Sequence, residues 1–212
     1  MTDVLGIIPA GGLAERFQGV DKELLPISRT DCGLTRCIQT MQLGGANDIL
    51  LFTNRKKLMN HWNRIKDLQG VRMYAQELRG LWEVIAEAGK TIAKWYYFAM
   101  PDTVFPLNTF MHDKADVLAG TFITNSPERF GVFHGNVIVD KRPDDGIFTA
   151  WGVWIWSEKS MRTLIKTCLE THDLTQALNT IIGSELKTFP LAYYHDFASF
   201  EDYKDFICHS PI

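Results

Sequence analysis

The sequence lacks the features that mark secreted, membrane-spanning or repetitive proteins. Its 212 residues include no apolar run of the ~18 residues that a membrane span needs, and no basic-then-apolar leader at the N-terminus. The four cysteines form no C-x-x-C pair and have no histidines at zinc-finger spacing, so we expect reduced thiols in a cytoplasmic protein. No linker, low-complexity segment or internal repeat divides the chain. We therefore expect a single domain over residues 1–212 that binds no membrane.

Neither sign of charge dominates the sequence. The 22 Lys and Arg residues against 25 Asp and Glu give a net charge of −3, which offers no general attraction to nucleic acid. Apolar residues make up 46% of the chain and charged residues 22%, as in ordinary globular proteins. A chain of this length buries roughly 70% of its unfolded surface and needs no disulfide or metal staple. We expect a globular protein with a local functional site and no nucleic-acid partner.

What the sequence does contain is an alternation of short apolar runs and amphipathic segments. Such an order is typical of a mostly parallel sheet with helices on both faces. In the first half, the predicted strands are residues 4–9, 48–53, 71–75 and 95–100, and the predicted helices are 34–43, 55–68 and 80–92. In the second half, the predicted strands are 117–123, 130–133, 136–139, 148–156 and 186–189, and the helices are 158–169, 174–182 and 200–207. The pattern predicts one α/β domain with an inserted antiparallel patch.

The loop after the first predicted strand carries the strongest chemical signal. Open α/β sheets bind ligands at the carboxyl ends of their strands. The small residues Ala10, Gly11 and Gly12 let backbone N–H groups approach phosphate oxygens, and Arg16 and Lys22 supply two cations for a triphosphate. The loop is neither a mononucleotide P-loop nor a dinucleotide fingerprint, because no Gly-Lys-Ser/Thr follows and the third glycine is missing. From the spacing alone, a structural turn with two solvated cations explains the loop equally well.

Further segments extend this signal along the chain. Ala-Gly-Gly-x-x-x-Arg at 10–16 leads into Lys-Glu-Leu-Leu-Pro at 22–26, and Pro-Asp-Thr-Val-Phe spans 101–105. Ser-Pro-Glu-Arg-Phe-Gly-Val spans 126–132, Asp-Lys-Arg-Pro spans 140–143, and Tyr-His-Asp-Phe-Ala-Ser spans 194–199. Shorter matches occur at 45–50 and 80–83. In this order, the segments resemble the sugar-1-phosphate nucleotidylyltransferase family over nearly the whole chain.

The resemblance implies a fold and a reaction. The fold is a single three-layer α/β/α, Rossmann-like domain with a mostly parallel mixed sheet and a small antiparallel insertion. The reaction is Mg²⁺-dependent transfer of a nucleotidyl group from an NTP to a sugar 1-phosphate, which gives an NDP-sugar and pyrophosphate. We expect a monomer or small homo-oligomer. The chain ends about where the catalytic domain of relatives ends, so no feedback site for a nucleotide sugar is expected.

The resemblance also implies roles for individual residues. Arg16 and Lys22 would be catalytic, neutralising the triphosphate, and Asp102 and Asp196 would hold Mg²⁺ from strand ends at one sheet edge. Either aspartate also suits the N-cap of a following helix, and the residues alone leave that alternative open. The implied nucleotide-binding residues are Ala10, Gly11, Gly12, Gln76, Gly80, Glu83 and Pro101. The implied sugar-phosphate-binding residues are Gly131, Asp140, Lys141, Trp151 and Gly152, with Gly152 offering its backbone to hydroxyls and Trp151 either a stacking platform or core.

Glu83 stands where thymidylyltransferases of the family place a glutamine. An ionised glutamate only accepts hydrogen bonds, so a Glu83 that reaches the base predicts a preference for CTP or GTP. Alternatively, Glu83 occupies a helix start near Gly80, where the helix dipole favours acids. Backbone groups of the first loop would then read the base, and a thymidylyl or uridylyl preference would survive.

Other functions remain open at this point. One is a nucleotidylyltransferase for a non-sugar phosphate acceptor. Another is a non-catalytic nucleotide-sugar binding protein of the same fold, against which the intact set Arg16, Lys22, Asp102 and Asp196 argues. A glycosyltransferase is the weakest alternative, because Pro101-Asp102-Thr103 is not an Asp-x-Asp motif.

Overall fold

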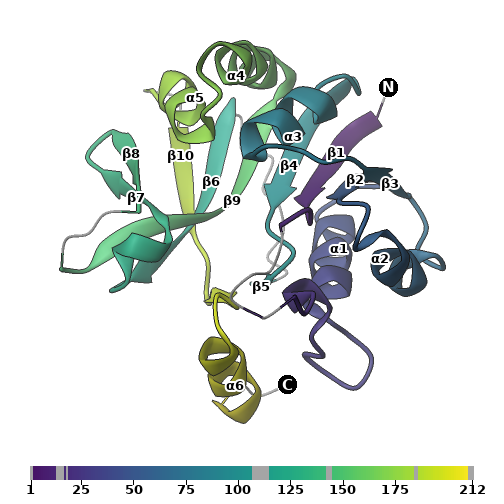
Figure 1. Cartoon of the computed structure of the whole chain (residues 1–212). Coiled ribbons are helices and arrows are strands. Elements are labelled where there is room, and N and C mark those ends of the chain that lie inside the picture. The colour runs from purple at the N-terminus through teal and green to yellow at the C-terminus, as the bar shows by residue number, and fades with distance from the viewer. Residues whose placement is uncertain are drawn as a thin grey trace.

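A computed structural model of the chain describes residues 2–12, 17, 19–106, 115–141, 145–183 and 186–209. The predicted fold class is confirmed, because a mostly parallel sheet lies between two layers of helices (Figure 1). None of the described helices is long and apolar enough to cross a membrane.

The main sheet has the strand order β10-β6-β9-β4-β1-β2-β3. Four strands run parallel to one another, namely β1 (Thr2–Pro9), β2 (Asp48–Thr53), β3 (Val71–Ala75) and β4 (Ala93–Ala99). On the other side, β9 (Phe148–Ser157) is antiparallel to both β4 and β6 (Val117–Thr124), and β10 (Leu186–Pro190) pairs in parallel with β6. The predicted antiparallel insertion is a hairpin of β7 (Gly131–His134) and β8 (Val137–Asp140), which joins β9.

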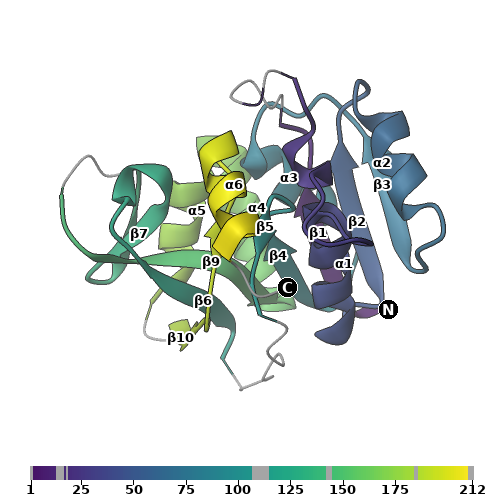
Figure 2. The same ribbon diagram turned by 90° about the horizontal axis from the view of Figure 1, so that it is seen from below.

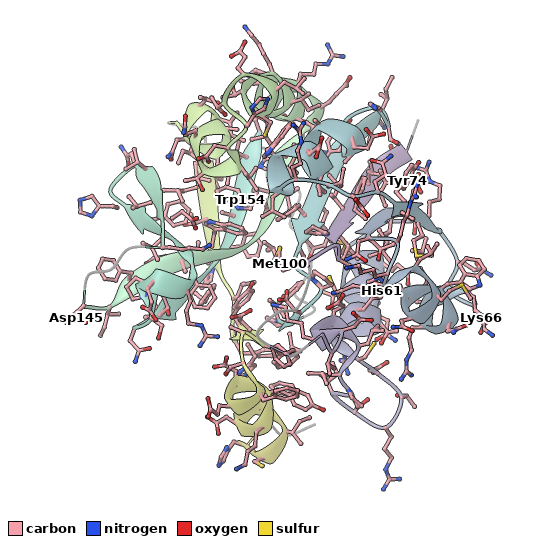
Figure 3. The ribbon with its side chains drawn as sticks, viewed as in Figure 1. His61, Lys66, Tyr74, Met100, Asp145 and Trp154 are labelled. Carbon is pink, nitrogen blue, oxygen red and sulfur yellow. The ribbon has the colours of Figure 1, made fainter. Side chains whose placement is uncertain are left out.

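The helices cover both faces of this sheet. On one face lie α1 (Gly33–Leu43) and α2 (Leu58–Ile65). On the other face lie α3 (Leu81–Ala88), α4 (Glu158–Thr171) and α5 (Leu174–Ile181), which pack over the fully buried Trp154 and Trp156. Trp154 is labelled in the middle of the sheet in Figure 3. Each face therefore buries its own apolar core, as a three-layer domain requires.

Two predicted helices are shorter than their amphipathic pattern suggests. The Asn54 side chain accepts a hydrogen bond from the Lys57 backbone N–H at 3.0 Å, and this turn delays the start of α2 to Leu58. Gly89 caps the C-terminus of α3, so the helix ends at Ala88 rather than at residue 92. A polar side chain bonded to the backbone and a C-terminal glycine thus set boundaries that apolar periodicity does not reveal.

A second, two-stranded sheet was not predicted. Its strands are β5 (Thr103–Val104) and β11 (His195–Asp196), which pair antiparallel below the carboxyl end of β4. The last helix, α6 (Phe200–His209), follows β11 and lies between the β7–β8 hairpin and α1 in the view from below (Figure 2). The described residues also include the 3₁₀ turns η2 (Lys22–Leu24) and η3 (Pro127–Arg129). The small sheet brings the end of the chain to the end of β4.

Candidate active site

A cavity of about 360 Å³ opens where β1, β2, β3 and β4 end. Most of the residues that the sequence assigned to the nucleotide gather around it, as expected for parallel strands whose carboxyl ends meet. The lining includes the predicted residues Ala10, Gly11, Gly12, Lys22, Gln76, Gly80, Pro101 and Asp102. Met100, labelled near the centre of Figure 3, also lines it. Arg16 lies outside the described residues.

The first loop presents open backbone to this cavity. The Ala10 N–H donates to the Phe52 carbonyl at 2.7 Å, and the Asn54 side chain donates to the Gly11 carbonyl at 2.9 Å. These hydrogen bonds fix the first loop to the carboxyl end of β2. Gly11 and Gly12 are exposed, and a Cβ added to Gly12 would meet no described atom within 4 Å. The glycines therefore leave room for phosphate oxygens to approach the backbone.

Lys22 and Asp102 form an ion pair at the cavity wall. Lys22 begins the η2 turn, and Asp102 follows β4 and is only 5% exposed. Gly33 at the start of α1 packs against the Pro101 and Glu23 carbonyls, so α1 holds the two segments together. Burial opposes the charge of Lys22, but the attraction of Asp102, with Asp196 and Glu23 behind it, outweighs burial and raises the pKa of Lys22.

Asp196 meets Asp102 across the small sheet. Asp196 pairs with Thr103 in the β5–β11 ladder, and the Phe197 N–H donates to the Asp102 carbonyl at 3.0 Å. Burial, and then the negative charge of Asp102, raise the pKa of Asp196. Arg129 opposes that shift by donating to Asp196 Oδ2 at 2.8 Å. The structure thus brings together two carboxylates that lie far apart in the sequence.

The two aspartates are not helix caps. Asp102 is followed by strand β5. At the start of α6, the Ser199 hydroxyl accepts from the Asp202 N–H at 3.1 Å and the Asp202 carboxylate accepts from the Ser199 N–H at 2.8 Å. Ser199 and Asp202 therefore supply the cap, and the capping alternative is wrong for both predicted metal ligands.

The donor set fits a magnesium ion that is shared with phosphate. Asp102 Oδ1 is buried and has no hydrogen-bond partner among the described residues, so one carboxylate oxygen is available to a cation. Asp102 and Asp196 would be two hard oxygen donors, and Mg²⁺ commonly takes one or two carboxylates together with phosphate oxygens and water. In the described part of the chain, no group of three or more His, Cys, Asp or Glu side chains could hold an ion. A metal here would need ligands from its substrate.

The predicted sugar-phosphate residues form a separate patch on β7, β8 and β9. Gly131 pairs with Asp140, and the Lys141 N–H donates to the Phe130 carbonyl at 3.0 Å. The Asp140 and Lys141 side chains are exposed. None of the five predicted residues of this group lines the cavity at the strand ends.

One expectation for this patch is wrong, that for Gly152, and of the two alternatives for Trp151 the structure has the core. The space over Gly152, where β9 is irregular opposite Gly120 and Thr121, is filled by Tyr194, so the glycine allows close packing there. Likewise, the Trp151 indole fills the space over Gly131 and packs against the core beneath α4 and α5, which contradicts the stacking platform. Side chains that only the fold brings together occupy both positions.

Glu83 is placed at the start of α3, away from the cavity lining. Its carboxylate accepts from the Arg79 backbone N–H at 2.7 Å and from the Arg79 guanidinium at 3.2 Å. The backbone hydrogen bond, followed by the side-chain bond, lowers the pKa of Glu83. This is the helix-start geometry that the sequence left as an alternative to base reading. Glu83 is not among the described residues that line the cavity.

Sequence reasoning missed other residues of the cavity, above all Thr53, Lys57 and Arg79. A usable signal was present for Lys57, since Arg55-Lys56-Lys57 follows the carboxyl end of β2 directly. The same strand-end rule that selected the first loop could have selected this segment. Lys57 also interacts with Glu23, and that contact cannot be read from a separation of 34 residues.

No family model and no curated protein matches this chain. A solved structure of a Bacillus anthracis protein, provisionally assigned as a glucose-1-phosphate thymidylyltransferase and crystallised with sucrose, is similar with a TM-score of 0.83. The similarity covers 97% of this chain and 94% of that one at 16% sequence identity. The likeness is one of fold. It shows that the chain has the same three-layer, Rossmann-like fold as that structure.

The influence of Asp102 on Asp196 predicts that a substitution of Asp102 changes the pKa of Asp196. In Asp102→Asn, the pKa of Asp196 should fall, because a negative charge that opposes ionisation of Asp196 is removed. Carboxyl ¹³C NMR titration measures this directly. Asp48→Asn, a change at the opposite end of β2, serves as the control and should leave Asp196 unaffected. An unchanged or higher Asp196 pKa in Asp102→Asn would show that the two carboxylates do not interact.

Proposed function

We propose that the chain is a Mg²⁺-dependent nucleotidylyltransferase that transfers a nucleotidyl group from an NTP to a sugar 1-phosphate. The observation that carries the proposal is the cavity at the strand ends. There the glycines of the first loop and the Lys22–Asp102 ion pair converge. The small sheet sets Asp196 opposite Thr103, the residue that follows Asp102. The fold similarity and the order of the sequence motifs support the same function.

The NTP would bind in this cavity. Open backbone at Gly11 and Gly12 would receive phosphate oxygens, and Lys22 would exchange part of its contact with Asp102 for the α-phosphate. Arg16 would neutralise the β- and γ-phosphates. Gln76, Gly80 and Pro101 line the same cavity and would contact the nucleoside.

Asp102 and Asp196 would hold the magnesium ion, and the ion would supply charge neutralisation for the triphosphate when bound. The protein's own task is positioning, since phosphoryl-type transfer requires little covalent chemistry from side chains. A sugar-phosphate oxygen attacks the α-phosphorus in line, the bond between the α-phosphorus and its bridging oxygen breaks, and pyrophosphate leaves. Lys22 would stabilise the negative charge that redistributes on the α-phosphate.

The acceptor side is supported by fewer contacts than the nucleotide side. Lys141 and Asp140 at the end of β8 would contact the sugar phosphate, together with the backbone beside Gly131. Because Trp151 and Tyr194 fill the space over Gly131 and Gly152, these glycines give no added support to a sugar. A non-sugar phosphate acceptor is therefore retained as the second candidate.

A pyrophosphate-release screen tests the function. It combines ATP, GTP, CTP, UTP and dTTP with Mg²⁺ and a panel of sugar 1-phosphates, plus phosphocholine and a simple alcohol phosphate. Release that requires a sugar 1-phosphate supports the proposal. Release only with a non-sugar phosphate selects the second candidate. Tight NTP binding without release in any combination would contradict an enzymatic role.

Substitution of the carboxylates should reduce turnover without unfolding the protein. We expect Asp102→Ala and Asp196→Ala each to lower the rate by about 10²–10³, because a preorganised charge at the reacting phosphates is lost. Asp48→Ala, which removes a half-buried carboxylate paired with Arg72, is the matched control and should keep the wild-type rate. Initial rates at limiting Mg²⁺, with thermal unfolding as a check on folding, measure the effect. A near-wild-type rate in either variant would remove that residue from the metal site.

The geometry of Glu83 predicts that it does not select the base. In Glu83→Gln, the ranking of the five NTPs by kcat/KM should stay as in the wild type, because the side chain is held by Arg79 outside the cavity lining. Gln76→Glu should reorder the ranking, since it places an acceptor-only side chain at the cavity. A shift of Glu83→Gln towards dTTP and UTP would restore Glu83 as the residue that reads the base.

A further inference from the structure

Three titratable side chains are buried beside Lys22, and the proposed reaction uses none of them. Glu23 is 2% exposed, Lys57 5% and His61 0%. Glu23 comes from the η2 turn, whereas Lys57 and His61 belong to the segment that follows β2 and forms α2. In Figure 3, His61 is labelled between α2, which carries it, and α1.

A single oxygen joins these side chains. Glu23 Oε1 accepts from Lys57 Nζ at 2.7 Å and from His61 Nε2 at 2.9 Å. The other ring nitrogen of His61, Nδ1, is hydrogen-bonded to Thr53 Oγ1 at 2.7 Å, at the end of β2. Glu23 and Lys57 reach the cavity wall, but their charged atoms face each other.

Asp21, which precedes Lys22 in the sequence, is also held by the segment around α2. Lys57 Nζ lies 3.5 Å from Asp21 Oδ1, and the Asn60 side chain donates to Asp21 Oδ2 at 2.8 Å. Both neighbours of Lys22 are thus bound to the segment around α2. Lys22 itself points to Asp102 on the β4 side.

Charge at this depth needs a compensating partner. Burying an ion costs several kcal/mol unless it is paired and hydrogen-bonded, so a carboxylate as buried as Glu23 depends on its partners. Burial opposes the ionisation of Glu23, yet the hydrogen bonds from His61 and Lys57 outweigh it and keep the pKa of Glu23 below its ordinary value. The buried group is therefore an ionised, fixed anchor for the turn.

We propose that Glu23, Lys57 and His61 form a clamp that positions Lys22, by fixing the η2 turn to the β2–α2 segment so that the Lys22 ammonium is directed at Asp102 and the cavity. The three are positioning residues, because they act through Lys22. The catalytic consequence rests on the proposed nucleotidyl transfer, whereas the effect on Lys22 itself does not.

The first measurement is independent of any enzymatic activity. Brief acylation of the purified protein with an amine-reactive reagent, read by peptide mass spectrometry, reports how often Lys22 leaves Asp102. We expect Glu23→Gln and Lys57→Met each to raise the labelling rate of Lys22 by roughly 3- to 10-fold, because local opening of the turn becomes easier. Lys57→Arg, which keeps the charge, should restore most of the protection. Labelling of the exposed Lys94 is the internal reference.

The matched control is Glu87→Gln. Glu87 also pairs with a lysine, Lys90, at 2.6 Å, but Lys90 is exposed and the pair lies at the C-terminal end of α3. This variant should leave Lys22 labelling unchanged. If Glu23→Gln does not fold, Lys57→Met tests the clamp from its other side. Wild-type labelling of Lys22 in a folded Glu23→Gln or Lys57→Met protein would overturn the proposal.

The second measurement separates positioning from stability. Glu23→Gln should lower kcat by roughly 10- to 100-fold, since a small misplacement of a catalytic group has effects of that size, while the KM for NTP changes less. In a Lys22→Ala background, the same substitution should lower kcat no further, although its effect on thermal stability should persist. Equal losses of kcat in both backgrounds would contradict action through Lys22. If no acceptor supports turnover, the labelling result still decides the clamp while the proposed function fails.

Discussion

The Lys22–Asp102 ion pair is the interaction on which the candidate site depends. It joins the turn that follows the first loop to the segment that follows β4, and Asp102 is buried while Lys22 is half-buried. A buried pair of this kind adds little net stability, but removing one partner leaves an uncompensated charge. The pair also leaves Asp102 Oδ1 without a partner among the described residues, and the negative charge of Asp102 acts on Asp196. The charges of Lys22 and Asp102 balance each other in this structure. When a polyanion and a divalent cation bind together, Lys22 can pair with the polyanion and Asp102 with the cation.

Further charged side chains continue from this pair in both directions. Towards α6, Asp196 is bound by Arg129, which also binds Asp202 at 2.9 Å. Towards α2, Glu23 is bound by Lys57 and His61. Arg129 holds Asp196 in place, and Lys57 and His61 hold Glu23 in place. The side chains at the site are therefore fixed by ion pairs. Neighbours that hold the side chains of a site keep their positions within the narrow range that group transfer requires.

Much of the fold and half of the site could be predicted from the sequence, for identifiable reasons. Strand ends and the Gly11–Gly12 loop are local features, and the rule that parallel strands end at one edge was enough to bring Lys22, Gln76 and Asp102 together. Pairing of β5 with β11 was invisible, because strands of two residues have no periodicity. Contacts between segments that are distant in the sequence could not be predicted. Tyr194 fills the space over Gly152, Trp151 fills the space over Gly131, and Lys57 binds Glu23. For Glu83 the sequence left base reading and a helix-start position open, and the structure has the second, with Arg79 as its donor.

The most direct test of the account is a crystal structure with Mg²⁺ and an NTP analogue whose α,β-bridging oxygen is replaced by methylene. The account predicts the nucleotide in the cavity at the ends of β1, β2, β3 and β4, with Lys22 within hydrogen-bond distance of the α-phosphate and a metal ion held by Asp102 and Asp196. A nucleotide bound elsewhere, or a Lys22 that remains on Asp102 with no metal beside it, would contradict the central claim.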